Sequence, residues 1–515
     1  MIEQHNTLAE KFIKKGFWLY LFSFIISPIG YIIKIVLSGN LAVDEIGIIY
    51  GVMSLMVLLA SFNDLGMSES LNKFLPEYIT NNRYDKAKSI LFYAISTQIV
   101  TGFIVFLIFF FGSDFLSIHY FHDVKSLIVI KIFSFYFLGF TFFHGLNVFF
   151  QAVQDTFSQK ITELFRITFV LFFVLIFYIL DLGTLALYSL TWVLGLYIGI
   201  IVTIFLFHKK YYKKHLKGIK IIYSKKLFLD ILKYALIVFL GSQASTILSQ
   251  VDMQMIIYLL GNEDAGYYTN YLSMIGIPFV LIGPIFAFLF PVFSEMVAKN
   301  EIKKINMIKS IFTKNFLSFS IVFSILFWVF GTVISTILFG DKFLKSGIIL
   351  QYSVLFLSFN FLLQINFNIL AANGKVKQRL YIILKALLFN IILNLVLIKL
   401  IGVSGAAIAT GLGWIFIWFL SELELKDYHT KFDYFYLFKN ILIFGFIGLC
   451  MYLFLVPFFK SLNNRVLEFF ILSIVSIIYF GIYVFVNLED FKYFYKQVRK
   501  VKAGDNLGND NLDFG

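Results

Sequence analysis

The sequence is poor in charge, in proline and in cysteine. Only 14% of its residues are charged and 60% are hydrophobic, whereas a soluble domain has about 25% charged and about 45–50% apolar residues. The single cysteine, Cys450, excludes an intramolecular disulfide. Apolar runs of 18 or more residues recur along most of the chain, and each can cross a bilayer core about 30 Å thick. The composition therefore predicts an integral membrane protein.

The patterns of soluble catalytic modules are also missing. The sequence has no P-loop, no cluster of metal ligands and no extramembrane segment longer than about 30 residues. We therefore expect no enzyme, no cofactor and no direct use of ATP. A net charge of +13 would suggest nucleic acid binding in a soluble protein. Here the basic residues lie in short connections between apolar runs, so membrane topology explains them and no nucleic acid partner is expected.

Fourteen apolar segments are expected to form spans of an all-α, polytopic membrane protein. The N-terminal segment is kept as the first span, because its apolar part of about 20 residues is longer than the 7–15 typical of a signal peptide. The approximate limits of the spans are 17–37, 46–63, 89–112, 126–152, 161–180, 184–207, 231–260, 267–293, 311–339, 346–372, 380–400, 404–421, 438–458 and 466–486.

The basic residues are distributed unevenly between the two sides. Alternate connections, counted from the N-terminal tail, carry 34 Lys and Arg residues, and the intervening connections carry 6. The positive-inside rule then predicts that both termini are cytoplasmic, in the inner (cytoplasmic) membrane. The largest cluster, HKKYYKKHLKGIKIIYSKK (208–226), is interpreted as a topogenic linker that also contacts anionic lipid headgroups. Recruitment of substrate is the alternative role for this segment.

The sequence repeats itself at an offset of 219 residues. The offset pairs Gly47 with Gly266, Gly112 with Gly331, Gln159 with Gln378, and Gly183 with Gly402. Six spans thus repeat as six in the same orientation, and transporters built from parallel repeats bind substrate between the halves and open the cleft alternately. The predicted domains are a first bundle (1–207), a basic cytoplasmic linker (208–230), a second bundle (231–425), two additional spans (426–488) and a cytoplasmic tail (489–515).

Three segments resemble those of a known family. They are SGNLAVDEIGIIYGVMSL, ESLNKFLPEYITNNRYDKAKS and SQVDMQMIIYLLGNEDAGYYTNYLSM. Together with the order of the spans they resemble Wzx-type polysaccharide flippases of the multidrug/oligosaccharidyl-lipid/polysaccharide exporter superfamily, over about residues 1–425. One departure is Met253, where the family often has a basic residue after the aspartate of the seventh span.

The resemblance implies two six-helix bundles around a central cavity that the first and seventh spans line. It implies that an undecaprenyl-pyrophosphate-linked oligosaccharide is flipped from the cytoplasmic to the outer leaflet for synthesis of a surface polysaccharide such as O-antigen. The partners expected from it are the lipid-linked oligosaccharide, membrane lipids, and a polysaccharide polymerase with its chain-length machinery.

The first and seventh spans carry polar stripes. On the seventh span one face carries Ser242, Ser245, Ser249 and Asp252, and the adjoining stripe carries Gln243, Thr246, Gln250 and Gln254. On the first span the stripe is Ser23, Ser27, Gly30 and Lys34, which the offset of 219 places on Ser242, Thr246, Ser249 and Met253. Lys34 and Asp252 are therefore expected at nearly equal depth.

Two charges within spans indicate a transport pathway. A charge at the centre of a span costs at least about 2.5–3.5 kcal/mol, so it faces a cavity or a partner. We expect Lys34 to meet the pyrophosphate. Asp252 is expected either to pair with Lys34 in the empty cavity or to take up H⁺ or Na⁺. For the hydroxyl residues, contact between helices is the favoured role.

Other polar residues give weaker signals. Asn360 and Gln364 on the tenth span are equally compatible with helix–helix contact and with lining the pathway, and Lys131 on the fourth span could meet an anionic lipid carrier. Arg166 is expected to be solvated near an interface. Pro278, Pro284 and Pro291 are expected to kink or break the eighth span.

Two other functions compete with flipping. A cation-coupled multidrug exporter of the same superfamily would use Asp252 as its coupling site and leave Lys34 secondary. A membrane enzyme, such as an O-antigen polymerase, usually needs a sizeable catalytic loop. The expected outer connections are short, about 3–13 residues, which disfavours that class.

Overall fold

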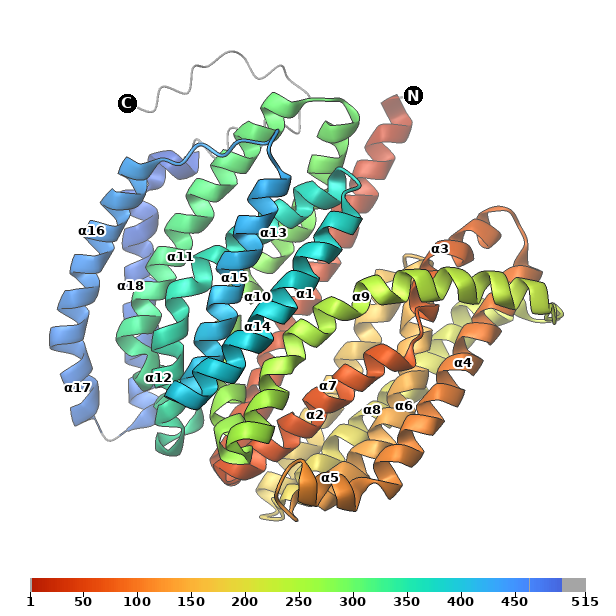
Figure 1. The fold of residues 1–515 in the computed structure, drawn as a ribbon, viewed down its shortest axis with the longest axis horizontal. Helices are drawn as coiled ribbons and strands as arrows, with labels where there is room; N and C mark the ends of the chain where they lie inside the picture. Colours follow the sequence, from red (N-terminus) through yellow and green to blue (C-terminus); the bar gives the residue numbers. More distant parts are fainter. Residues whose placement is uncertain (1, 463, 493–515) are drawn as a thin grey trace. The chain divides into compact units, whose positions relative to one another are not determined.

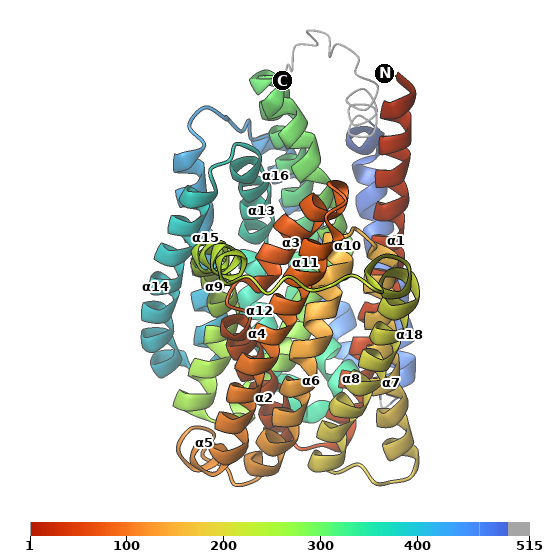
Figure 2. The same cartoon turned by 90° about the vertical axis from the view of Figure 1, so that its right-hand side faces the viewer.

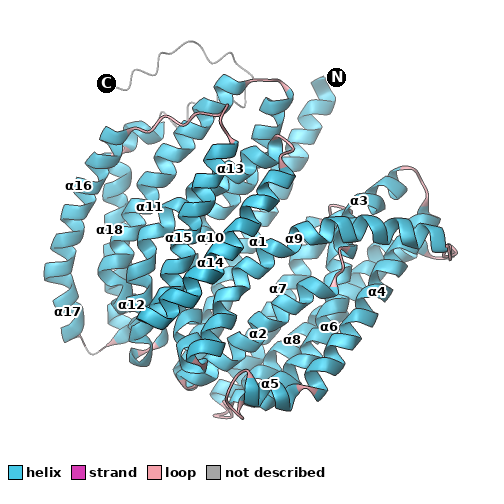
Figure 3. Cartoon of the chain, viewed as in Figure 1, coloured by secondary structure: helices cyan, strands magenta, loops and turns pink. Residues whose placement is uncertain are grey.

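The structure is a computed structural model that describes residues 2–462 and 464–492. The side chains of residues 2–20 and of positions 237, 238, 240–242, 284, 287, 288 and 460 are outside this description. Every regular element in the described ranges is a helix and none is a strand (Figure 3). The predicted all-α fold is therefore confirmed.

The helices of the first half follow the expected spans closely. They are α1 (Ile2–Asn40), α2 (Val43–Asn63), α4 (Tyr84–Phe111), α6 (Ser126–Ala152), α7 (Thr156–Ile179) and α8 (Leu185–Phe207). Two short helices were not expected, α3 (Met67–Thr80) and α5 (Ser113–His119), and a π-helical segment, η1 (His208–Leu216), continues α8. These three elements are too short or too polar to give the hydropathy signal of a span, so they are seen only in the structure.

The second half contains longer and more interrupted helices. They are α9 (Lys225–Leu260), α10 (Asn262–Ala298), α11 (Ile302–Phe339), α12 (Leu344–Ser353), α13 (Leu357–Ala372), α14 (Val376–Ile401) and α15 (Val403–Glu424). The last elements are α16 (Tyr434–Cys450), the π-helical η4 (Met451–Leu455), α17 (Val456–Ser461) and α18 (Arg465–Val486), while the 3-10 turns η2 (Asp341–Phe343) and η3 (Val354–Phe356) flank α12. The expected tenth span is thus two helices joined by a 3-10 turn.

Twelve helical stretches among the described residues are long and apolar enough to cross a membrane. The expected seventh and eighth spans, α9 and α10, are also helices, and both contain positions outside the description. Of the expected kink or break in the eighth span, the break is wrong, because α10 continues as one helix across Pro278, Pro284 and Pro291. A kink stays a prediction. A proline removes one backbone hydrogen bond, and the neighbouring turns of a long helix keep theirs.

The helix bounds follow the offset of 219 residues. Adding 219 to Val43, where α2 begins, gives 262, where α10 begins. The starts of α4, α6, α7 and α8 likewise fall within one residue of the starts of α11, α12, α14 and α15. The longer helices of the two halves therefore begin at corresponding positions, although α3 and α5 have no separate counterparts in the second half.

By its internal contacts the chain divides into two compact units. Unit 1 comprises Met1–Pro284 and Ile383–Ala409, and unit 2 comprises Ile285–Ile382 and Thr410–Gly515. The division differs from the two sequence bundles, whose limits remain a prediction. In unit 1, α8 packs against α6 and α7, α4 lies beside α6, and α1 lies along α7 (Figure 2). In unit 2, α11 is the central helix and contacts α12, α13, α16 and α18 (Figure 1).

The basic segment between the halves is a strap fixed to α4. Lys88 donates hydrogen bonds to the carbonyls of Leu216 (3.1 Å) and Ile219 (2.8 Å), and the Tyr93 hydroxyl donates to the carbonyl of Ile222 (2.8 Å). The amide of Ile222 in turn donates to the hydroxyl of Ser89 (2.7 Å). We call residues 208–224 the strap. Its irregular part satisfies backbone groups with side chains of α4, which holds it in one place.

Asp155 ties the start of the strap to α7. Its carboxylate accepts hydrogen bonds from the Ser158 amide (3.0 Å), the Lys210 ammonium (3.0 Å) and the Tyr211 hydroxyl (2.9 Å). Burial alone would raise the pKa of the Asp155 carboxyl. The hydrogen bonds from Ser158, Lys210 and Tyr211 outweigh burial, and the pKa lies below its ordinary value.

Replacing Asp155 with Asn should weaken the attachment of the strap and make the stability of the protein depend less on pH. A carboxyl whose folded-state pKa is lowered contributes stability at neutral pH and loses it as the pH falls below about 4, through the folded-state pKa. Thermal unfolding of the purified protein in detergent at pH 7 should show a lower melting temperature for Asp155→Asn than for the wild type. The difference should shrink in acid, and a constant difference would contradict this role.

Candidate transport site

The candidate site lies in unit 1, where α1, α2, α9 and α10 meet. Helices α2 and α10 approach closely at Gly47 and Gly266. A Cβ atom on Gly47 would lie 1.8 Å from the carbonyl oxygen of Asn262, and one on Gly266 would lie 2.1 Å from that of Val43. Each glycine thus contacts the first residue of the other helix. The two contacts are related by the offset of 219, because it carries Val43 and Gly47 onto Asn262 and Gly266.

Lys34 on α1 is a buried cation with neutral partners. The residue is 6% exposed. Its ammonium donates hydrogen bonds to the Thr269 carbonyl, the Thr269 hydroxyl (2.9 Å) and the Ser273 hydroxyl (2.8 Å), and it lies 4.3 Å from the centre of the Tyr50 ring. No carboxylate of the described residues forms an ion pair with it. Dipoles and an aromatic face therefore replace a counter-ion.

Asp252 on α9 has partners of its own. It is 5% exposed and accepts hydrogen bonds from the Tyr268 hydroxyl (3.0 Å) and the Asn394 amide (2.6 Å). Asn394 also donates to Asn390 one turn away on α14 (3.0 Å). In this structure Asp252 is therefore held by α10 and α14, while Lys34 is held by α10. The two are linked indirectly, because Tyr268 and Thr269 are consecutive residues.

The contacts around Ser54 and Ser273 repeat one another. The Tyr31 hydroxyl of α1 donates to the carbonyl of Ser273 on α10 (2.8 Å), and the Ser54 hydroxyl of α2 donates to Gln250 on α9 (2.8 Å). The offset of 219 carries Tyr31 onto Gln250 and Ser54 onto Ser273. Helix α1 thus contacts α10 at the positions where α9 contacts α2. Gln254 adds a hydrogen bond to Ser54 (2.8 Å).

The other predicted site residues are spread more widely. Ser27 and Gln243 are half-buried on α1 and α9, Lys131 is half-buried on α6, and the exposed Ser249 donates to the carbonyl of Thr246 on its own helix. Asn360 and Gln364 lie on α13 in unit 2. Asn360 has a buried side-chain oxygen that accepts no hydrogen bond from a described residue. The assignment of these residues to a transport pathway remains a prediction.

Arg166 corrects an expectation. It was expected to be solvated near an interface, but its side chain is only 12% exposed and is paired with Glu163 on the preceding turn of α7. The guanidinium also contacts the Tyr136 hydroxyl of α6 (3.5 Å). An Arg and a Glu three residues apart face the same side of a helix, so the spacing already contained the signal.

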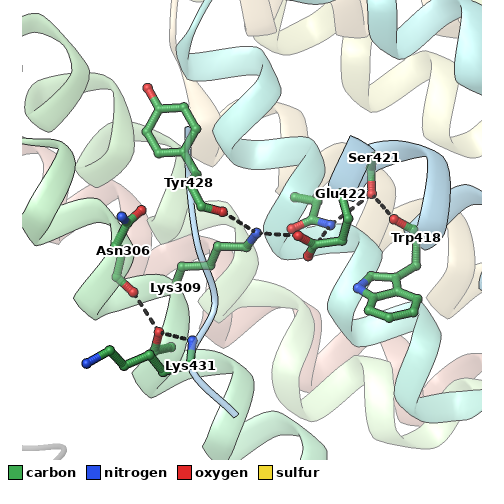
Figure 4. A network of polar contacts seen from close by, with 9 residues as sticks. Asn306, Lys309, Trp418, Ser421, Glu422, Tyr428 and Lys431 are labelled. Carbon is green, nitrogen blue, oxygen red and sulfur yellow. Dashed lines mark hydrogen bonds and ion pairs between the residues drawn. The ribbon is translucent and has the colours of Figure 1, made fainter. Parts of the chain in front are cut away.

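A second buried cation, Lys309 of unit 2, was missed from the sequence. It is 1% exposed, and its ammonium lies 2.9 Å from the Glu422 carboxylate and 3.2 Å from the carbonyl of Tyr428 (Figure 4). The Asn366 amide of α13 donates to both Glu422 (3.0 Å) and Ser421 (2.8 Å). Lys309 and Glu422 lay just outside the expected limits of their spans, so each was counted as an interfacial charge.

Replacing Lys309 with Met should destabilise unit 2. Glu422 would keep its buried position without its cation. We expect a loss of about 2–3 kcal/mol, less than the 3–5 kcal/mol typical of a fully buried pair, because 29% of the Glu422 side chain is exposed. Adding Glu422→Gln should restore much of the loss in unfolding experiments in detergent. If Lys309→Met were as stable as the wild type, the pair would contribute nothing to stability.

A double-mutant cycle should test the partners of Lys34. Ser273→Ala removes one acceptor from a buried ammonium, which should lower the free energy of unfolding by about 1–3 kcal/mol. In a Lys34→Met background the same change should have little effect, because no cation then needs the hydroxyl. Equal losses in the two backgrounds would show that Ser273 acts independently of Lys34.

Comparison of the sequence with known proteins assigns the chain to a family. Residues 12–297, more than half of the chain, match the family of polysaccharide biosynthesis proteins. The uncharacterized membrane protein MJ1068 of Methanocaldococcus jannaschii is 29% identical over 500 residues, which cover 92% of this chain and 94% of the relative. The uncharacterized membrane protein MJ1375 of the same organism is 26% identical over 402 residues, covering 74% and 90%.

Two solved structures have the same fold. The lipid II flippase MurJ in an inward closed conformation aligns with a TM-score of 0.68 at 16% identity, covering 91% of this chain and 99% of MurJ. An inward-facing multidrug resistance transporter of the MATE family, in the MOP superfamily, aligns with a TM-score of 0.62 at 12% identity, covering 79% and 94%. At such identities the likeness concerns the fold alone. The chain is therefore a multi-pass membrane protein that belongs to the polysaccharide biosynthesis protein family and has the fold of the MurJ and MATE transporters.

Proposed function

We propose that the protein flips a lipid-linked oligosaccharide, carried on a polyprenyl pyrophosphate such as undecaprenyl pyrophosphate, across the cytoplasmic membrane by alternating access. The family match and the flippase fold support this class of substrate. The observation that carries the proposal is the ammonium of Lys34, buried within a span among neutral oxygens. In the proposed orientation both termini are cytoplasmic.

A cation with only neutral partners suits a pyrophosphate. A phosphate oxygen offers the ammonium a stronger hydrogen bond than a hydroxyl, because the acceptor is charged. When Thr269 and Ser273 exchange for such an oxygen, both hydroxyls are free to donate to the same anion. A carboxylate counter-ion would have to be displaced first, which would cost much of the gain.

Asp252 is proposed as the group that couples the cycle to H⁺ or Na⁺. Its hydrogen-bond donors, Tyr268 and Asn394, each hold one oxygen of the buried carboxylate. Because Tyr268 precedes Thr269 on α10, a change in the charge of Asp252 acts on the same turn of helix that holds Lys34. In this proposal the flipped lipid is then passed to a polysaccharide polymerase with its chain-length machinery.

Replacing Lys34 with Met should slow flipping strongly while the protein still folds. Losing one charge-assisted contact of about 1.5–3 kcal/mol should slow transport by about 10- to 100-fold. The measurement is translocation of a fluorescent lipid-linked oligosaccharide in proteoliposomes, read by quenching from outside. Lys34→Arg should retain part of the rate. Lys125→Ala is the matched control, because Lys125 is exposed and pairs with Asp44 outside this site.

Three outcomes separate the proposals. Unchanged flipping by Lys34→Met at equal protein level would remove Lys34 from the mechanism. If Asp252→Asn flips equally with and without an ion gradient, Asp252 is the coupling site. If the wild type moves cationic dyes against a gradient and ignores the oligosaccharide lipid, the protein is a cation-coupled multidrug exporter instead.

A further inference from the structure

Unit 1 has an apolar cavity, whose lining does not include Lys34 or its partners. This pocket, of about 390 Å³, lies where α3, the start of α4, the end of α6 and the strap meet. Its volume is within the roughly 300–1,000 Å³ of small-molecule sites in proteins. The apolar residues that line it are Leu75, Pro76, Ile79, Ala87, Phe149, Ala152, Val153 and Leu216. Its lining includes no Asp, Glu, Lys or Arg.

The strap builds one wall of the pocket. Tyr211, His215 and Leu216 contribute to the lining from the strap. The His215 ring is stacked on Tyr84 at the start of α4, with ring centres 5.8 Å apart. Lys88 fixes this wall through its hydrogen bond to the carbonyl of Leu216 (3.1 Å). The pocket is therefore a fixed feature of unit 1.

Cations without carboxylate partners among the described residues lie next to lining residues in the sequence. Arg83, Lys213, Lys214 and Lys217 are direct neighbours in sequence of the lining residues Tyr84, His215 and Leu216, or lie two positions away. All four are exposed, and none forms an ion pair within the described part of the chain. Glu77 and Asp85 also flank the lining, so these four cations still exceed the two carboxylates by two charges. We call these four cations the rim.

We propose that the pocket binds an anionic phospholipid of the surrounding bilayer, with an acyl chain in the apolar cavity and the phosphate at the rim. Basic pockets at the ends of membrane helices, on the side predicted here to face the cytoplasm, suit anionic headgroups. The largely apolar lining offers a soluble polyanion no Lys or Arg, whereas an acyl chain gains by leaving water. Tyr84 and Tyr211 in the lining suit the headgroup layer.

The bound lipid joins the strap to α3 and α4. Its chain contacts Leu216 of the strap together with Leu75 and Ala87 of the two helices, so it fastens the segment that connects the repeats. The proposal is independent of which substrate the protein transports.

Native mass spectrometry of the full-length protein should test lipid binding. Phosphatidylglycerol should bind more tightly than phosphatidylcholine with the same acyl chains. The triple variant Lys213→Gln/Lys214→Gln/Lys217→Gln should weaken binding of phosphatidylglycerol by about 100-fold, since each basic residue near a membrane surface contributes about a factor of five. Thr80→Trp, which fills the cavity from an exposed position, should weaken both lipids.

A matched triple variant provides the control. Lys220→Gln/Lys225→Gln/Lys226→Gln removes the same charge from exposed positions outside the lining and should leave the affinity within about twofold of the wild type. Equal affinity for the two lipids, or equal loss in the two triple variants, would overturn the proposal. Competition by glycerol 3-phosphate as strong as by the whole lipid would also overturn it, because the site would then bind a soluble anion.

Discussion

The structure around the candidate site depends on the close crossing of α2 and α10. Gly47 and Gly266 leave no room for a side chain, since a Cβ atom on either would meet a backbone oxygen within about 2 Å. One turn beyond each glycine stands a residue that contacts Lys34: Tyr50 on α2 and Thr269 on α10. If the crossing were wider, the ring and the hydroxyl could not both reach the same ammonium. The crossing therefore positions the charge.

The internal repeat accounts for the helix–helix contacts of the site, whereas the charged residues of the site are not repeated. Corresponding pairs of residues hold α1 to α10 and α9 to α2, so the two halves contribute equivalent contacts. The charges do not repeat: the counterpart of Lys34 is Met253, and the counterpart of Asp252 is Ile33. A duplicated framework thus carries one cation and one anion, each at a position whose repeat counterpart is apolar. Such an asymmetric site distinguishes the anionic end of a ligand from the rest.

Much of the fold could be predicted from the sequence, and less of the site. Hydropathy located the helices because a span must be apolar over its whole length, and periodicity placed Lys34 on a polar stripe. The partners of Lys34 could not be predicted, because depth along a helix says nothing about the lateral distance to Thr269. The burial of Lys309 could not be predicted, because a lysine at the end of a span is usually solvated. In the structure its long side chain reaches back to Glu422.

The contacts of Lys34 also bear on how the protein is made. Chains emerge from the ribosome with the N-terminus first. The strap can dock on α4 early, since Lys88, Ser89 and Tyr93 are already in place when residues 216–224 appear. The hydrogen bonds of Lys34 can form only later, because all three oxygens that accept them belong to α10, more than 230 residues further along the chain. Until α10 is inserted, the Lys34 ammonium lacks all three of these hydrogen-bond acceptors, and the membrane insertion machinery has to accommodate the charge.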